Sequence, residues 1–230
     1  MARILLLETS TATLSAALAD NGKVVQERIC TEPRQQASLA APMVKEVLDA
    51  AGITVADCDA VCVSKGPGSY TGLRVGVSTA KGLCFGAGIP LLSAGTLDIL
   101  AAQAREIPCP TGQLRYVVPM IDARRMEVYT AVYTPDGHRL TEVSPLVVDA
   151  SSFADRLQEG PVLFIGDGAL KCKEVISSPN AFFRETAPLA SAMAGLAQRA
   201  FDKKRFEDIA YFEPFYLKDF IATVPKKKLF

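Results

Sequence analysis

The stretch that decides the fold is Ser64-Lys65-Gly66-Pro67-Gly68-Ser69-Tyr70-Thr71-Gly72-Leu73-Arg74-Val75-Gly76. The sequence predicts a buried strand over residues 59–64, directly before this loop, and a helix over residues 73–85, directly after it. Glycine-rich loops in this position often bind anions, because backbone N–H groups and the helix dipole favour negative charge. This loop lacks the Gly-Lys-Ser/Thr ending of a P-loop, and it has threonine at position 71, where a dinucleotide fingerprint needs glycine. A purely structural passage from strand to helix is at least as consistent with the pattern.

The segments on either side alternate between strand and helix patterns. Strands are predicted over residues 3–8 and 14–18, with a hairpin turn at Asp20-Asn21-Gly22. A helix over residues 36–51 follows from apolar residues spaced four apart, and a short strand (90–92) and a helix (96–104) come after the decisive stretch. Beyond a Pro- and Gly-rich break, strands are predicted at 116–121, 127–133 and 162–165, and a helix at 189–203.

This order of elements predicts an α/β protein with two lobes, each a mixed sheet with helices. Residues 1–105 are expected to form the N-terminal lobe, completed by residues 208–230, and residues 106–207 a second, smaller α/β lobe. The aromatic segment Pro214-Phe215-Tyr216-Leu217 is expected to pack back on the first half.

Composition limits the chemistry that the chain can carry. The 25 basic and 25 acidic residues balance, whereas a protein that grips many phosphates alone usually has a basic excess, so RNA contact is expected to be local or delegated to a partner. Lys226-Lys227-Lys228 is the best local candidate for such contact, although a solvated tail is the more common role of such a run. No segment approaches the roughly 20 apolar residues that span a bilayer, which predicts a soluble, cytoplasmic protein.

The cysteines and the lone histidine argue against a metal site. The six cysteines include no Cys-x-x-Cys pair, and a Cys58–Cys62 metal pair, though possible, has no histidine nearby. His138 is the one histidine in the sequence, so the chain alone cannot form a two-histidine metal site. It lies in a predicted turn with no evident nucleophilic serine, so no Ser-His-Asp triad is indicated. We therefore expect no bound metal and no catalytic residue.

The helix of the decisive stretch carries small residues every four positions, namely Gly72, Gly76, Ala80 and Cys84. A glycine in mid-helix costs roughly 1 kcal/mol relative to alanine, and close approach of another backbone commonly offsets that cost. The approaching backbone could belong to the same chain or to another subunit, and the spacing favours neither. Glu8 and Asp122, each at the end of a predicted strand, are placed like active-site carboxylates, although a capping or turn role is more common there.

Several blocks of this sequence together resemble one known family. They are the decisive stretch continued to Ala80-Lys81-Gly82-Leu83, the opening Leu6-Leu7-Glu8-Thr9-Ser10-Thr11, the block 121–129 and the tail 214–217. In this order they resemble the TsaB family, the dimerisation subunits of bacterial tRNA threonylcarbamoyladenosine synthesis. The resemblance covers essentially the whole chain.

The resemblance implies two actin-like, ribonuclease H-like lobes and a non-catalytic role. The family's catalytic relative carries a His-x-x-x-His metal site, which this chain lacks, and its actin-like relatives place an aspartate where this chain has Glu8. The chain also departs from the family pattern at Ala37, where a histidine is common. The resemblance therefore implies a scaffold that supports threonylcarbamoyl transfer to N6 of the adenosine next to the tRNA anticodon.

The implied partners are the metal-bearing catalytic homologue in a heterodimer, a P-loop ATPase subunit, and tRNA through the complex; alone, the chain is expected to form a homodimer. No cofactor and no membrane are implied.

Glu8, Thr9 and Ser10 are candidates for a nucleotide at an interface. An ATP-dependent small-molecule kinase, hinted at by Glu8 and Gly166-Asp167-Gly168, and a peptidase are the alternatives. The expected subunit interface comprises Leu39, Met43, Val47, Gly72, Gly76, Ala80 and Leu83.

Overall fold

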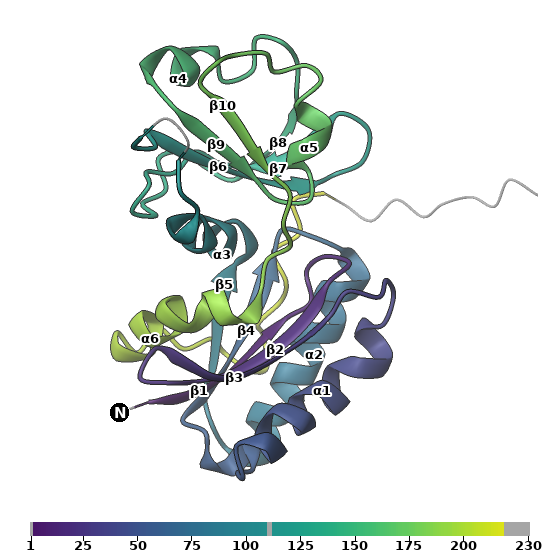
Figure 1. The fold of residues 1–230 in the computed structure, drawn as a ribbon. Helices are drawn as coiled ribbons and strands as arrows, with labels where there is room; N and C mark the ends of the chain where they lie inside the picture. Colours follow the sequence, from purple (N-terminus) through teal and green to yellow (C-terminus); the bar gives the residue numbers. More distant parts are fainter. Residues whose placement is uncertain (1, 110–111, 219–230) are drawn as a thin grey trace, which may run out of the picture.

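The computed structural model describes residues 2–109 and 112–218, which form two lobes joined by helix α3 (Figure 1). Lys226-Lys227-Lys228 lies outside the described residues. Each lobe is built on a five-stranded mixed sheet, with strand order β3-β2-β1-β4-β5 in the first and β10-β9-β6-β7-β8 in the second. The predicted α/β class with a mixed sheet in each lobe is confirmed.

The first lobe contains most of the elements that the sequence predicts. Its hairpin turn at Asn21 and Gly22 has positive φ at both residues, as a two-residue turn between twisted strands requires. The strand β1 pairs antiparallel with β2 and parallel with β4, which places the carboxyl ends of β1 and β4 at the same edge. The elements are β1 (Arg3–Glu8), β2 (Leu14–Asp20), β3 (Lys23–Cys30), α1 (Gln36–Ala50), β4 (Ala60–Gly66), α2 (Tyr70–Ala87), β5 (Leu91–Gly95) and α3 (Thr96–Gln103).

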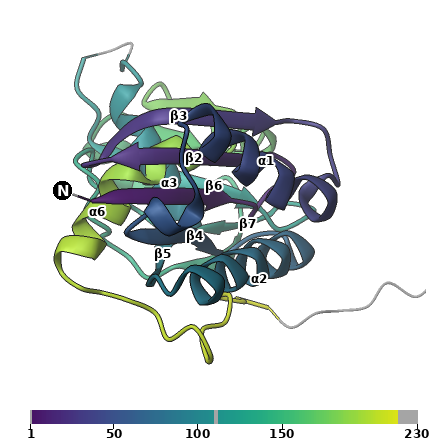
Figure 2. The same cartoon turned by 90° about the horizontal axis from the view of Figure 1, so that it is seen from below.

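The helices α1 and α2 lie side by side on one face of the first sheet (Figure 2). They bury an aliphatic cluster that includes Leu5, Leu7 and Leu18 from the sheet and Val44 and Val77 from the helices. The helix α2 begins where the Ser69 hydroxyl accepts a hydrogen bond from the Gly72 N–H, and it ends at Gly88, which has positive φ.

The second lobe is smaller and its strands are short. Its elements are β6 (Tyr116–Asp122), β7 (Glu127–Thr130), β8 (Ser144–Val147), α4 (Ala154–Glu159), β9 (Val162–Ile165), α5 (Ala169–Cys172) and β10 (Ala181–Arg184). One face of this sheet packs against α4 and α5, and the other packs against α3 through Leu97, Leu100 and Ala101. The helix α3 therefore joins the two lobes by packing as well as by sequence.

The chain returns to the first lobe before residue 208. A 3-10 turn (Ala190–Met193) and helix α6 (Ala194–Asp202) cover the face of the first sheet opposite α1 and α2. The sequence prediction placed residues 106–207 in the second lobe, yet Ala190, Met193 and Ala197 are buried against Ile4 and Leu6. The physical reason is that the first sheet is apolar on both faces, so it needs a second covering layer that the first 105 residues do not supply.

Residues 208–218 extend along the first lobe toward the second. Ile209 and Phe212 pack against the cluster under α2, and Lys81 donates hydrogen bonds from Nζ to the carbonyls of Ala210 (3.1 Å) and Phe212 (3.2 Å). Farther along, the Phe215 N–H donates to the carbonyl of Lys65 at 2.7 Å, and the Tyr216 ring lies 4.9 Å from that of Tyr70. The tail segment 214–217 thus packs on the first lobe in the described structure.

Candidate functional site

The carboxylate that ends β1 is fully buried. Glu8 Oε1 accepts hydrogen bonds from the Ser10 N–H at 2.5 Å and from the Ser64 hydroxyl at 3.1 Å, while Oε2 has no partner among the described residues. Burial raises the pKa of Glu8 from its ordinary value of 4.5 to about 7, and the hydrogen bonds only partly oppose this effect. Near neutral pH this position therefore holds a carboxyl group that is partly protonated.

The glycine-rich loop packs directly onto the segment that follows Glu8. The Ser69 N–H donates to the Ser10 carbonyl at 2.7 Å, and the Thr9 hydroxyl donates to the Gly72 carbonyl at 2.8 Å. A Cβ atom on Gly68 would lie 2.3 Å from the Ser10 carbonyl oxygen, so only glycine permits this approach. The loop acts here as a structural passage, because its backbone packs against residues 9–10.

This packing bears on the residues predicted to meet a nucleotide. Glu8, Thr9 and Ser10 have no exposed surface, which leaves a nucleotide nothing to touch on these side chains in this conformation. They do lie together, as their sequence adjacency implies. A nucleotide role for them remains a prediction.

The small residues at 72 and 76 meet the same chain, and not a groove for a second subunit. A Cβ atom on Gly72 would lie 2.1 Å from the Thr9 carbonyl oxygen, and one on Gly76 would lie 2.2 Å from Thr9 Oγ1. Ala80 is fully buried in the cluster beneath α1 and α2. The interpretation of these three positions as a surface groove is therefore corrected: Thr9, in the loop after β1, approaches Gly72 and Gly76, and Ala80 lies in the core.

The apolar residues predicted for the interface also face inward. Met43 and Val47 are buried in the same cluster, and Leu39 and Leu83 are partly buried against it. These positions follow the apolar stripe of each helix, and that stripe is the one that packs on the sheet.

The outward faces of α1 and α2 have a different composition. On α2 they carry Ser78, Gly82, Phe85 and Gly86, and the Phe85 side chain is 84% exposed. A Cβ atom on Gly82 or Gly86 would meet nothing within 4 Å, so no neighbour within the described chain accounts for these glycines. Sequence reasoning missed this second series of small residues, although it has the same four-residue spacing as the first.

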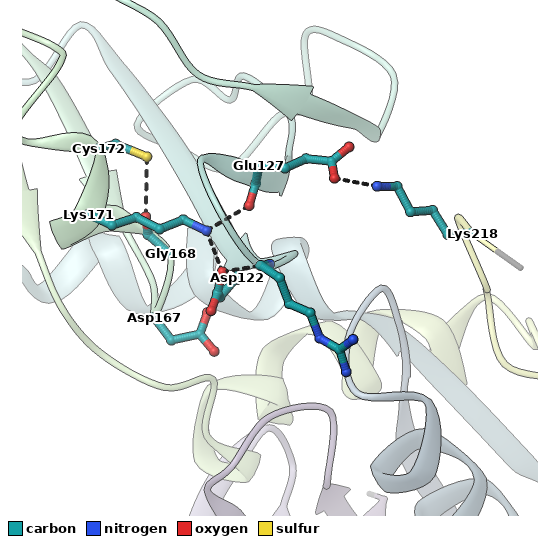
Figure 3. Close-up of polar contacts among 8 residues, drawn as sticks. Asp122, Glu127, Asp167, Gly168, Lys171, Cys172 and Lys218 are labelled. Atoms are coloured by element: carbon teal, nitrogen blue, oxygen red, sulfur yellow. Dashed lines mark hydrogen bonds and ion pairs between the residues drawn. The ribbon is translucent and has the colours of Figure 1, made fainter. Parts of the chain in front are cut away.

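The second lobe carries a polar cluster at the end of β6 that faces the first lobe (Figure 3). The Asp122 N–H donates to Asp167 Oδ1 at 2.9 Å, and Lys171 Nζ forms an ion pair with Asp122 and donates to the Glu127 carbonyl at 2.7 Å. Burial raises the pKa of Asp167. Asp122, which has no evident partner in the sequence, is therefore neutralised by Lys171, and Lys218 from the tail forms an ion pair with Glu127.

The cysteines and His138 do not come together. Cys58 belongs to the core cluster on one face of the first sheet and Cys62 to the cluster on the other, so the pair cannot bind one ion. His138 is exposed on a turn, as predicted, with Nε2 3.3 Å from Asp136 Oδ2. Within residues 2–109 and 112–218, no group of three or more His, Cys, Asp or Glu side chains is arranged to hold a metal. No helix of this part combines the length and hydropathy needed to cross a bilayer.

Comparisons with known proteins point to tRNA threonylcarbamoyladenosine biosynthesis. The family model described as TsaD, tRNA N6-adenosine threonylcarbamoyltransferase, matches residues 31–226. The chain is 30% identical over 228 residues to the tRNA threonylcarbamoyladenosine biosynthesis protein TsaB of Escherichia coli, covering 96% of both chains. It is 34% identical to the protein of the same name from Bacillus subtilis, over 75% of this chain and 74% of that one. The solved structure of YeaZ from Pseudomonas aeruginosa is similar with a TM-score of 0.82 and 28% identity, covering 94% of this chain and 100% of that one.

Proposed function

This chain belongs to the TsaB family of tRNA threonylcarbamoyladenosine biosynthesis proteins, and on that basis we propose that it is the non-catalytic subunit of the modification complex. It takes part in tRNA threonylcarbamoyladenosine biosynthesis and not in small-molecule phosphorylation. Its proposed task is to pair with a metal-bearing catalytic homologue that transfers the threonylcarbamoyl group to N6 of the adenosine beside the anticodon. The proposed location is the cytoplasm, where the tRNA is.

The state of the polar side chains supports a non-catalytic role. The two strand-end carboxylates are both engaged: Glu8 is enclosed by its own loop and Asp122 is paired with Lys171. A general base or metal ligand needs access to its substrate or ion, which Glu8 lacks here. The exposed His138 has only Asp136 as an ion-pair partner among the described residues, and nothing there resembles a nucleophile–base–acid arrangement.

The outward face of α1 and α2 is the surface that we assign to the partner. It is defined by Ala37 and Ala41 on α1 and by Ser78, Gly82 and Phe85 on α2, all of which are exposed. A mid-helix glycine costs about 1 kcal/mol relative to alanine, and Gly82 gains no contact within the described chain in return. A helix pair from another subunit, packed closely over the small residues with Phe85 in a pocket, would compensate for that cost and form a four-helix bundle.

The same face can pair two copies of this chain, since a twofold axis would bring identical helix pairs together. We therefore propose a homodimer for the isolated chain, which the catalytic homologue displaces. A P-loop ATPase subunit and tRNA are proposed as further members of the complex. No cofactor is assigned to this chain.

The direct test is to change Gly82 to leucine and Phe85 to alanine, one at a time, and to measure binding to the catalytic homologue. A leucine at position 82 would hold the helices apart, so we expect at least about a thirtyfold loss of affinity, the size of a binding hot spot. At protein concentrations low enough to keep the unmodified chain monomeric, the melting temperature should not fall, because the position is open within the chain and leucine is the better helix former.

Gly195→Leu is the matched control, because it makes the same change at an exposed position of α6, on the other side of the first sheet. It should leave pairing within about twofold of the unmodified chain, since exposed substitutions away from special features have small effects. Full pairing by both Gly82→Leu and Phe85→Ala would show that this face is not the interface.

A further inference from the structure

A cavity of about 280 Å³ lies beside the open edge of the first sheet. It is lined by the end of β5, the start of α3, helix α6 and the segment that follows α6. Neither the buried loop after β1 nor the outward face of α1 and α2 contributes to it. The cavity is therefore separate from the surface that we assign to the partner.

Four cationic side chains line this cavity: Lys65 near the end of β4, Arg199 on α6, and Lys203 and Arg205 just beyond α6. Within the described chain none of the four forms an ion pair or a side-chain hydrogen bond. The chain as a whole carries no net charge, so a cavity with four unpaired cations is a local concentration. Such an arrangement is typical of a site for an anion of more than one charge.

The spacing of two of these cations adds to the argument. Arg199 lies in the last turn of α6 and Lys203 caps its C-terminus four positions later, which places two like charges close together at one helix end. Positive charge there is favourable for the helix dipole, but that role does not require both residues to line a cavity. A bound anion would remove the repulsion between them.

Two carboxylates complete the lining, Asp98 and Glu207. One oxygen of each is engaged by a hydroxyl group: Tyr133 donates to Asp98 Oδ1 at 2.7 Å and Ser93 donates to Glu207 Oε1. No hydrogen-bond donor is assigned to the second oxygen of either residue in the described chain. Asp98 also folds back toward Gly95 at the start of α3.

We propose that this cavity binds a ribose–phosphate unit, with the phosphate held by Arg199, Lys203 and Arg205 and sugar hydroxyls donating to Glu207 or Asp98. Guanidinium groups match phosphate geometry with paired hydrogen bonds, and free carboxylate oxygens accept from hydroxyls. The cavity volume fits one such unit and not a large ligand. The unit could come from the backbone of tRNA or from a free nucleotide, and both supply the same chemistry.

The test is to measure the affinity of the unmodified chain and of the double variant Arg199→Gln/Lys203→Gln for three probes. The probes are unmodified tRNA, AMP and 2′-deoxy-AMP. Both residues are exposed, so the fold should be retained, with an unchanged melting temperature. We expect at least about a tenfold loss of affinity, since hydrogen bonds between charged groups contribute strongly. Loss for tRNA alone identifies an RNA backbone, and loss for AMP alone identifies a free nucleotide; either result supports the site.

The matched control is Lys173→Gln/Arg184→Gln, which removes the same charge from exposed positions of the second lobe. Equal weakening by control and cavity variants, or no weakening by either, would overturn the proposal. A second variant, Glu207→Gln, should lower the preference for AMP over 2′-deoxy-AMP, because it weakens the acceptor for the 2′-hydroxyl. An unchanged preference in this variant would show that Glu207 does not bind the sugar hydroxyl.

The use of tRNA as a probe rests on the proposed function, but the two can fail separately. The cavity variant should still pair with the catalytic homologue, because it leaves the outward face of α1 and α2 untouched. Loss of pairing by Gly82→Leu with no effect of the cavity variant on any probe would retain the proposed function and exclude this site.

Discussion

Glu8 is the residue whose state depends most on the fold around it. Desolvation dominates its environment, so the folded chain favours the protonated carboxyl group and raises its pKa from 4.5 to about 7. A group whose pKa is raised by folding stabilises the protein fully below the unfolded pKa, and that contribution is lost as the pH rises through the folded pKa. The free energy of unfolding should therefore fall between pH 4.5 and pH 7 on account of this one residue.

Glu8→Gln tests this, because glutamine has the shape of the protonated acid and cannot ionise. At pH 8 the variant should be more stable than the unmodified chain by up to about 3 kcal/mol, and at pH 4.5 the two should nearly agree. Urea unfolding followed across that range measures the difference. Glu32→Gln makes the same change at an exposed position and should give parallel curves; a parallel curve for Glu8→Gln as well would mean that the carboxyl group ionises freely.

For single residues, the sequence identifies the notable side chains but does not identify the partners that they contact. Both Glu8 and Asp122 stand out because they end strands, and both prove to be engaged. Their partners, Ser64 and Lys171, lie 56 and 49 residues away along the chain. Such pairs form only when distant segments fold together, so no local pattern could have named them.

At the scale of the element, helix α2 shows how one periodicity can have two meanings. Small residues recur every four positions along two sides of it: Gly72, Gly76 and Ala80 face inward, and Ser78, Gly82 and Gly86 face outward. The spacing is the same in both, since one helical turn separates each pair. What distinguishes them is the neighbour, which is Thr9 for Gly72 and Gly76, the core cluster for Ala80, and open space for Gly82 and Gly86.

Alanine substitutions at Gly72 and Gly82 should therefore have opposite effects on stability. Gly72→Ala brings a Cβ atom against the backbone oxygen of Thr9 and should cost about 1–3 kcal/mol, as overpacking usually does. Gly82→Ala should stabilise the monomeric chain by about 0.5–1 kcal/mol through helix propensity alone. Denaturant unfolding at dilutions that keep the chain monomeric measures both effects, and a destabilised Gly82→Ala monomer would reveal an internal contact at that position.

The helix itself was predictable, whereas its orientation was not. The predicted ranges 36–51 and 73–85 agree closely with α1 (Gln36–Ala50) and with the body of α2 (Tyr70–Ala87), because period and capping signals are local. The apolar stripe containing Leu73 and Val77 marks the buried face of α2, and Gly72 and Gly76 lie beside it. Reading that stripe together with the glycines would have directed attention to Phe85 and Gly82 as the exposed side.

At the scale of the whole molecule, the tail holds the two lobes together. Phe215 and Tyr216 contact the end of β4 and the start of α2, while Lys218 pairs with Glu127 on β7 (Figure 3). The tail therefore spans the junction beside α3. The aromatic residues of the tail predict that it packs on the protein. The ion pair between Lys218 and Glu127 could not be predicted from composition.

Removing residues 214–230 should increase hydrogen exchange in residues 65–72 and in β7 by about tenfold or more, while α4 stays unchanged, since local opening follows the loss of local contacts. Mass spectrometry of the exchanged protein gives the comparison. Lys218→Gln alone should have a small effect, because exposed ion pairs contribute at most about 1 kcal/mol. Unchanged exchange in the truncated chain would show that α3 alone sets the arrangement of the lobes.

The return of the chain to the first lobe also has a consequence for biosynthesis. In the described structure, much of the cover on the face of the first sheet that carries Ile4, Leu6 and Leu92 comes from the segment 190–201, with Ile99 of α3 contributing as well. Translation proceeds from the N-terminus at roughly 5–20 residues per second, and domains generally fold as they emerge. On the ribosome, part of this apolar face therefore stays exposed until the entire second lobe has been synthesised. The nascent protein therefore passes through a stage in which chaperones would recognise it, and its two lobes reach completion in the reverse of the order in which they begin.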